Sequence, residues 1–167
     1  MSENMVEVND MALEIELTNM IKKFGLFSVS VWSEMDDAIK SGNLAKVKIL
    51  DKLGFEEYDD YTYNIVCCAA EHGQLEILKY LVHAGYDECH FGGIEIAAES
   101  GHLDVVKYLV SIGLSIEFPK PFQRAVSKAV QNGHFEIVKY LVSLGGIISK
   151  DNVNYQKYIV FCEKNVE

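Results

Sequence analysis

The segment GHLDVVKYLVSIG, residues 101–113, recurs as GHFEIVKYLVSLG at residues 133–145. The two copies agree at nine of 13 positions, and the four differences preserve polarity and approximate size. Fainter copies precede them as GQLEILKYLVHAG at 73–85 and GNLAKVKILDKLG at 42–54. In every copy the first and last glycines lie 12 residues apart, whereas the connectors between copies span 16 to 20 residues. A constant segment joined by connectors of variable length is typical of a stacked repeat array.

Each copy predicts a helix, and a shorter helix precedes it. In residues 91–113, apolar residues recur at helical spacing both before and after Gly101. The glycine that starts each copy, hereafter the opening glycine, suits a left-handed turn between the two helices. A small residue stands four positions before each opening glycine and predicts close contact between the first helices of neighbouring units: Ala38, Ala69, Ala97 and Ala129. The unit is therefore predicted to be a helix-turn-helix pair.

A small residue before a glycine, followed by G-H-L-[DE]-[VI]-V-K-Y-L-V-x-x-G, resembles the ankyrin repeat over roughly residues 32–145. The variant K-Y-L-V-S-x-G with shortened connectors looks most similar to the ankyrin arrays of giant, mimivirus-like viruses of amoebae. The resemblance implies an all-α ankyrin-repeat solenoid of helix-turn-helix pairs. The T-P-L-H sequence that begins the family's first helix is replaced in this chain. We therefore expect shortened, irregular connectors, with turns in place of projecting β-fingers.

The two ends of a repeat array expose apolar faces unless modified repeats cover them. Residues 9–31 contain the apolar segment LEIELTNMIKKFG and are expected to form an N-terminal capping half-repeat with its connector. Residues 1–8 before it are expected to be a flexible N terminus. Four ankyrin-like repeats are predicted in residues 32–153, and a C-terminal capping helix in residues 154–167.

The composition and the cysteines limit the partners and the compartment. The chain of 167 residues has 15 basic and 25 acidic residues, and its net charge of −10 would repel nucleic acid and acidic membrane surfaces. Its four cysteines show no C-x-x-C spacing, so we interpret them as reduced thiols of a cytosol-like compartment. The sequence shows no secretory signal and no apolar run of about 18 residues. These features favour a soluble cytoplasmic protein, in the host-cell cytoplasm if the chain is viral.

Chemical motifs with a fixed spacing are missing from the sequence, including phosphate-binding loops, dinucleotide fingerprints and hydrolase or metalloprotease motifs. Cys89 and His90, with His83 nearby, could belong to a metal site, but a fourth ligand at a suitable spacing is not evident. His102 and His134 belong to the repeat, and we expect them to form local hydrogen bonds near the helix junction. The sequence therefore indicates no catalytic, cofactor-binding or metal-binding residue, and no enzymatic activity.

The resemblance implies that a partner binds the concave face, at positions just before each first helix and just before each opening glycine. By register, the first set is Trp32, Tyr63, Phe91 and Gln123, and the second set is Lys40, Ser41, Glu71, His72, Glu99, Ser100, Gln131 and Asn132. Three of the first set are aromatic, and they would form either a binding ridge or packing contacts between connectors. Phe118 and Phe122 flank a proline-containing tip that could extend such a ridge.

These inferences predict a non-enzymatic protein-protein interaction module that binds a protein partner through the concave face of a monomeric array. A partner with basic character is favoured by the acidic balance of the chain. The alternative is a structural or assembly component that associates with itself or with a virion. The identity of the partner does not follow from the motif, because one scaffold serves many functions.

Overall fold

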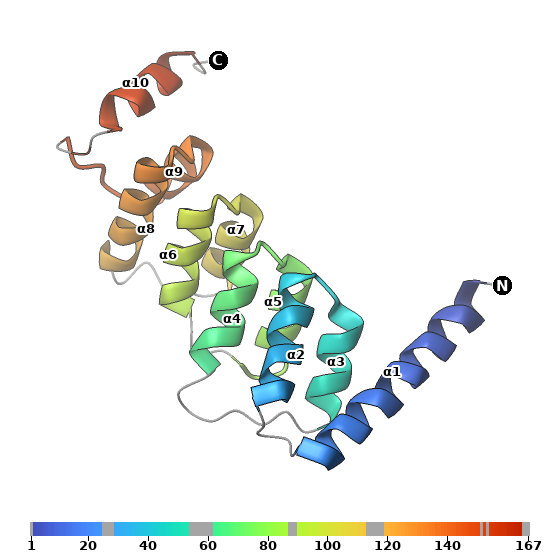
Figure 1. Ribbon diagram of the computed structural model, residues 1–167. Coiled ribbons are helices and arrows are strands. Elements are labelled where there is room, and N and C mark those ends of the chain that lie inside the picture. The colour runs from blue at the N-terminus through green and yellow to red at the C-terminus, as the bar shows by residue number, and fades with distance from the viewer. Residues whose placement is uncertain are drawn as a thin grey trace.

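The computed structural model describes residues 2–24, 29–53, 62–86, 90–112, 119–150, 152 and 154–164. Within these residues the chain forms helices and no strand. The elements in chain order are α1 (Ser2–Phe24), α2 (Val29–Lys40), α3 (Leu44–Lys52), α4 (Thr62–Glu71), α5 (Leu75–His83), α6 (His90–Ser100), α7 (Leu103–Ser111), α8 (Pro119–Asn132), α9 (Phe135–Ser143) and α10 (Tyr155–Lys164). Helices α2 to α9 form four helix-turn-helix units, with α1 at one end and α10 at the other (Figure 1). The predicted all-α repeat solenoid is confirmed.

The four units stack so that their helices form two rows (Figure 1). The first helices α2, α4, α6 and α8 contact one another in chain order, and so do the second helices α3, α5, α7 and α9. Each first helix also packs on the second helix of its own unit. Neighbours in space are therefore neighbours in sequence, as expected for a solenoid.

The core between the two rows is apolar, and none of the described polar or charged residues is buried in it. The four alanines that precede the opening glycines are at most 1% exposed, which confirms that small residues occupy the contact between first helices. The second helices contribute fully buried leucines from one repeated position: Leu50, Leu81, Leu109 and Leu141. The repeated sequence thus places the same side chains in the same layer of the core.

A hydrogen-bonded turn ends each first helix. The carbonyl oxygen of Ala97 accepts a hydrogen bond from the amide of His102 at 2.9 Å, and the three equivalent alanines accept equivalent bonds. The opening glycine inside this turn has a φ between +67° and +89° in all four units. Glycine adopts this left-handed conformation at little cost because it has no Cβ. The predicted glycine turn is confirmed, and it satisfies carbonyl groups that a helix end leaves without an intrahelical partner.

A second set of hydrogen bonds, which we call the ladder, joins neighbouring units. Each bond runs from a side-chain nitrogen to a backbone carbonyl oxygen two residues before an opening glycine: Gln74 Nε2 to Lys40 (3.2 Å), His102 Nε2 to Glu71 (2.8 Å), His134 Nε2 to Glu99 (3.0 Å) and Asn154 Nδ2 to Gln131 (2.7 Å). Because a carbonyl oxygen only accepts, Nε2 carries the proton in both imidazoles. The two histidines were expected to form local bonds. They instead bond to the preceding unit, because stacking brings together residues that are 31 and 35 positions apart.

The ladder residues also crowd the opening glycines of the preceding units. A Cβ added at Gly101 would lie 2.7 Å from Cε1 of His134, and one added at Gly73 would lie 2.5 Å from Nδ1 of His102. A Cβ added at Gly133 would meet no atom within 4 Å. Gly101 and Gly133 have similar φ values, +89° and +77°. They therefore share the same backbone requirement, but only Gly101 lies beneath a ladder residue.

The repeated tyrosines of the second helices have different partners. The hydroxyl of Tyr80 donates to one carboxylate oxygen of Asp51, and the hydroxyl of Tyr86 donates to the other at 2.7 Å. Burial and the Asp51 carboxylate raise the pKa of Tyr80 to about 12. In the next unit Val82 takes the repeat position of Asp51. The buried hydroxyl of Tyr108 consequently has no hydrogen-bond partner within the described structure.

Several helices begin earlier than the sequence indicates. Helix α1 begins at Ser2 and includes most of the segment that was expected to be a flexible N terminus. Helix α6 begins at His90 and contains Gly93, which is buried and would place a Cβ 3.2 Å from Leu109. Helix α8 begins at Pro119, so the expected proline tip is a first helical turn, where a missing amide hydrogen costs little. The predicted irregular connectors fall in residues 54–61, 87–89 and 113–118, outside the described residues.

Helix α10 contacts the last unit through an aromatic cluster. The ring centroid of Phe135 in α9 lies 6.1 Å from that of Tyr158 and 5.4 Å from that of Phe161. Aromatic pairs at such distances contribute packing energy beyond the area they bury. Together with the ladder bond from Asn154, this cluster holds α10 on the end of the array.

Replacement of Gly101 by alanine is expected to destabilise the array more than replacement of Gly133. Each substitution forces alanine into a left-handed conformation, at a cost of about 1 kcal/mol. Gly101→Ala must also displace the His134 ring from the Glu99 carbonyl, which adds about 1 kcal/mol. Urea unfolding followed by circular dichroism measures both losses. Equal losses would show that His134 is not held against the glycine.

Replacement of Tyr108 by phenylalanine is expected to stabilise the protein by about 1 kcal/mol, because it removes a buried hydroxyl without a partner. The matched change Tyr80→Phe removes a bond to a carboxylate and is expected to destabilise it by about 1.5 kcal/mol. Thermal unfolding at one protein concentration compares the two variants with the parent chain. A loss of stability in Tyr108→Phe would mean that its hydroxyl has a partner after all.

Candidate partner-binding surface

The side chains nearest to the ladder acceptors form a row across the four first helices, which we call the ladder row. Each unit contributes the two residues before its opening glycine, at or just after the end of its first helix: Lys40 and Ser41, Glu71 and His72, Glu99 and Ser100, and Gln131 and Asn132. All of them are exposed except Ser100, which is half-buried. The first helices contact one another in order, so these residues occupy equivalent ends of neighbouring helices (Figure 1).

The backbone beneath the ladder row is anchored. The first residue of each pair, Lys40, Glu71, Glu99 or Gln131, supplies the carbonyl oxygen that accepts a ladder bond. Its side chain stays exposed while its backbone is tied to the next unit. A surface that is already rigid before association loses less conformational entropy when a partner binds. The arrangement can therefore present several side chains to one macromolecule at little entropic cost.

Gln74 and Asn154 are ladder residues that sequence reasoning missed. A signal for Gln74 was present, because a polar residue follows every opening glycine. The first of these residues, Asn43, does something else: its side chain caps α3 by accepting a hydrogen bond from the amide of Lys46 at 3.0 Å. Asn154 follows no glycine, and only the placement of α10 reveals its role.

Charge is distributed unevenly over the first helices. Helices α2, α4 and α6 carry six acidic residues and one lysine, whereas α8 carries three basic residues and no acidic one. Two ion pairs connect α8 to α6: Lys128 Nζ to Glu99 Oε1 at 2.9 Å and Arg124 Nη1 to Glu95 Oε2 at 4.0 Å. Asp37 and Glu71 are exposed, and neither forms an ion pair with another described residue. The α2 and α4 end of the row therefore has uncompensated negative charge.

The structure describes the side chains of only some of the aromatic residues that were expected to form a ridge. Trp32 lies inside the first turns of α2, not before the helix, and it is half-buried against the core. The side chains of Tyr63 and Phe91 lie outside the described part of the structure, as does all of Phe118. The choice between a binding ridge and connector packing stays a prediction for these residues.

Phe122 is a correction to the expected ridge. Its side chain is 4% exposed and belongs to the hydrophobic core. Because α8 already begins at Pro119, Phe122 falls on the same helical face as the buried residues Ala125, Val126 and Ala129. Phe122 therefore stabilises the α8 packing and is not available to a partner on this surface.

An aspartate, a cysteine and a histidine meet where α2 contacts α4. Cys68 Sγ donates to Asp36 Oδ1 at 3.2 Å and lies 3.8 Å from His72 Nδ1, which is 3.0 Å from the Cys68 carbonyl oxygen. Burial and the Asp36 carboxylate raise the pKa of the Cys68 thiol to about 12. The thiolate is the nucleophilic form of cysteine, so this environment suppresses it. The cluster joins α2 to α4 and does not form a cysteine nucleophile.

The sequence predicted that all four cysteines are reduced, and the structure shows that this prediction is wrong for one of them. Cys67 is disulfide-bonded, whereas Cys68 and Cys162 are free. Sequence spacing does not exclude a bond between residues that folding brings together. Cys89 lies outside the described residues, and the residues that are described contain no group of three His, Cys, Asp or Glu side chains able to hold a metal ion.

Among the described helices, none combines the length and the apolar character needed to cross a membrane.

Cys68 is expected to resist alkylation in the native protein at pH 8, because its pKa of about 12 leaves almost no thiolate. Cys162, a free and partly exposed thiol, is expected to react first. Iodoacetamide treatment followed by peptide mass spectrometry distinguishes the two sites, and unfolding in guanidinium serves as the control in which both react. Rapid native labelling of Cys68 would contradict the proposed role of Asp36.

The repeat geometry agrees with comparisons with known protein families. A family model of three ankyrin repeats matches residues 94–159, and a model of many ankyrin repeats matches residues 66–110. No curated protein matches the chain significantly, so the narrower similarity to viral arrays rests on the repeated motif alone. Ankyrin repeats are generally protein-protein interaction modules and are typically not enzymes. The two matches together cover more than half of the chain and the last three stacked units, and the chain is an ankyrin-repeat protein.

Proposed function

We propose that this protein captures a protein partner along the ladder row. The observation that carries the proposal is the combination of exposed side chains with an anchored backbone at four equivalent positions. These side chains are exposed, so they do not form core contacts. The bonds that join the units at these positions are made by the backbone carbonyls. Glu99 also pairs with Lys128 of α8, so among the anchored positions Glu71 and Gln131 are the ones proposed to vary for recognition without altering the stack.

The charge of the row favours a partner with basic character. Glu71 stands in the middle of the α2, α4 and α6 segment, and its exposed carboxylate forms no ion pair with another described residue. Asp37, exposed on α2, adds a second carboxylate that forms no ion pair with another described residue. Complementary charge accelerates encounter and excludes wrongly charged partners more than it adds affinity. Binding should accordingly weaken as salt screens the surface.

The aromatic positions Trp32, Tyr63 and Phe91 remain part of the proposal as a second line of contacts. They share one repeat position near the N-terminal ends of α2, α4 and α6. Large aromatic side chains contribute strongly to interface energetics when a partner covers them. Trp32 is half-buried, so only part of its ring surface is left for a partner to cover.

The ladder-row proposal is tested by the double substitution Glu71→Ala and Gln131→Ala. Both changes remove exposed side chains and leave the ladder carbonyls in place, so the fold should be retained. We expect capture of the partner from extracts of the source cells to fall about tenfold, as when an interface contact worth about 1.4 kcal/mol is lost. Quantitative mass spectrometry of affinity-purified complexes measures the loss.

The matched control is Glu136→Ala with Lys139→Ala, two exposed positions on α9 in the other row of helices. This variant should capture the same protein as the parent chain, and circular dichroism should show equal helix content in all three chains. Unchanged capture by the ladder-row variant, with loss in the α9 variant, would move the binding surface to the second helices.

A further inference from the structure

Helix α1 has one face that is committed to the array. Leu17 is buried, and Leu13, Met20 and Ile21 pack partly buried against the same core. Glu14 Oε1 lies 3.0 Å from Lys52 Nζ in α3, an exposed ion pair at the edge of this face. The opposite face of the helix is therefore directed away from the repeats.

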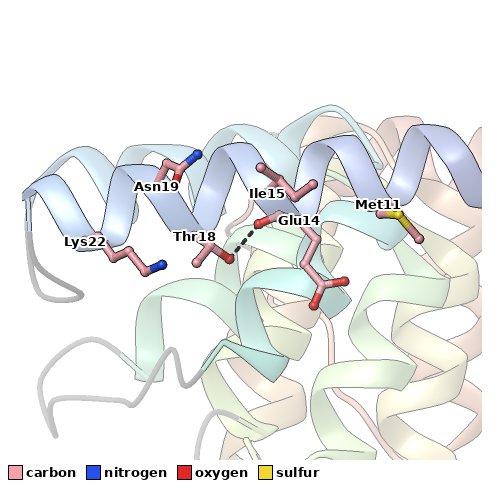
Figure 2. A pocket seen from close by; sticks show the side chains of 6 residues that line it. All are labelled: Met11, Glu14, Ile15, Thr18, Asn19 and Lys22. Atoms are coloured by element: carbon pink, nitrogen blue, oxygen red, sulfur yellow. Dashed lines mark hydrogen bonds between the residues drawn. The ribbon is translucent and has the colours of Figure 1, made fainter.

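That opposite face carries large apolar side chains that are exposed to solvent. Met11 is 65% exposed and Ile15 is 58% exposed, which places them among the most exposed large apolar side chains that the structure describes. Together with Glu14, Thr18, Asn19 and Lys22 they line a hollow of about 280 Å³ along the helix (Figure 2). No other described segment of the chain covers this hollow.

The spacing on this face is that of a helix-helix seam. Met11, Ile15, Thr18 and Lys22 are separated by four, three and four residues, and in the sequence the same alternation extends back to Val8, three residues before Met11. An average spacing of 3.5 residues keeps one stripe of a helix facing a partner helix. We refer to Met11, Ile15, Thr18 and Lys22 as the α1 seam.

We propose that the α1 seam docks on the α1 seam of a second copy of this chain, with the two helices antiparallel. The charge pattern of α1 favours a second α1 as the partner helix and an antiparallel orientation of the two. Five acidic residues of α1 precede its first basic residue, Lys22, and Lys23 follows. A parallel pair would place acidic halves side by side. An antiparallel pair places the basic last turn of each helix beside the acidic start of the other.

The pairing is isologous, so each apolar residue of the seam meets one from the partner helix. With the two-fold axis midway between Met11 and Ile15, Met11 of each chain faces Ile15 of the other. The N-terminal half of α1 lies clear of the stacked repeats (Figure 1) and can accept a second helix without displacing a unit. The dimer departs from the monomer that the sequence favoured, and it leaves the ladder row of both copies open to a partner.

The decisive measurement is the mass of the full chain in solution by light scattering and sedimentation equilibrium over a concentration series. The parent chain is expected to reach twice its 18.8 kDa as concentration rises. The variant Met11→Glu with Ile15→Glu is expected to stay at the single-chain mass with unchanged circular dichroism, because both side chains are exposed in the isolated chain. The control Ile147→Glu changes a residue that is 69% exposed on the segment before α10 and should dimerise like the parent chain.

Charge exchange tests the antiparallel direction. Lys22→Glu with Lys23→Glu should weaken self-association about tenfold, and mixing this variant with the variant Glu3→Lys with Glu7→Lys should restore a mixed dimer.

A parent chain that stays at single-chain mass up to its solubility limit overturns the proposal, and so does dimerisation that survives Met11→Glu with Ile15→Glu. If the two charge-exchanged variants form no mixed dimer, the antiparallel arrangement is overturned. None of these changes touches the ladder row, so partner capture reports independently on the proposed function.

Discussion

The stack depends on one hydrogen bond that is made between units: a side-chain N–H from one unit meets the carbonyl oxygen near the end of the preceding first helix. The last carbonyls of a helix lack intrahelical partners, and each ladder bond supplies one of them with a partner from the next unit. The left-handed glycine two residues later turns the chain so that the ladder residue can cross it closely. The bond therefore satisfies a helix end and joins neighbouring units, and at Gly73 and Gly101 the close ladder residue adds to the requirement for glycine that the positive φ already sets.

The same bond relates stability to recognition. Because the ladder uses backbone oxygens, the side chains of Glu71, Glu99 and Gln131 remain exposed, although that of Glu99 also pairs with Lys128 of the next unit. The uneven charge follows from what the neighbours offer: α8 supplies cations to Glu95 and Glu99, whereas nothing comparable faces Glu71 among the described residues. Negative charge thus concentrates where the backbone is already ordered, which suits association with a complementary surface. The two ends of the array differ. Aromatic contacts and a ladder bond hold α10 on the last unit, whereas α1 keeps the apolar side chains of its seam exposed.

Sequence reasoning succeeded for features that lie within one unit. The helix pairs and the glycine turns were predicted because each depends on residues within about ten positions, whereas the alanine contacts between units were predicted from one small residue repeated in every unit. It failed where a neighbour decides the outcome. Phe122 was placed at a proline-containing tip that could extend a binding ridge, yet α8 already begins at Pro119, contacts α6 and buries the ring. The reduced state of Cys67 was inferred from spacing, which carries no information about residues that stacking brings together.

The sequence by itself determined the repeat length, the order of helices and turns, and the ankyrin-type architecture, because these follow from local periodicity and from the conformational freedom of glycine. Only the tertiary structure decided which carbonyl each His or Gln side chain reaches, why Cys68 keeps its proton, why the Tyr108 hydroxyl lacks a partner and which face of α1 stays uncovered. Each of these depends on groups about thirty residues apart or on a packed neighbour. Their hydrogen bonds, desolvation and burial exist only once one unit rests on the next.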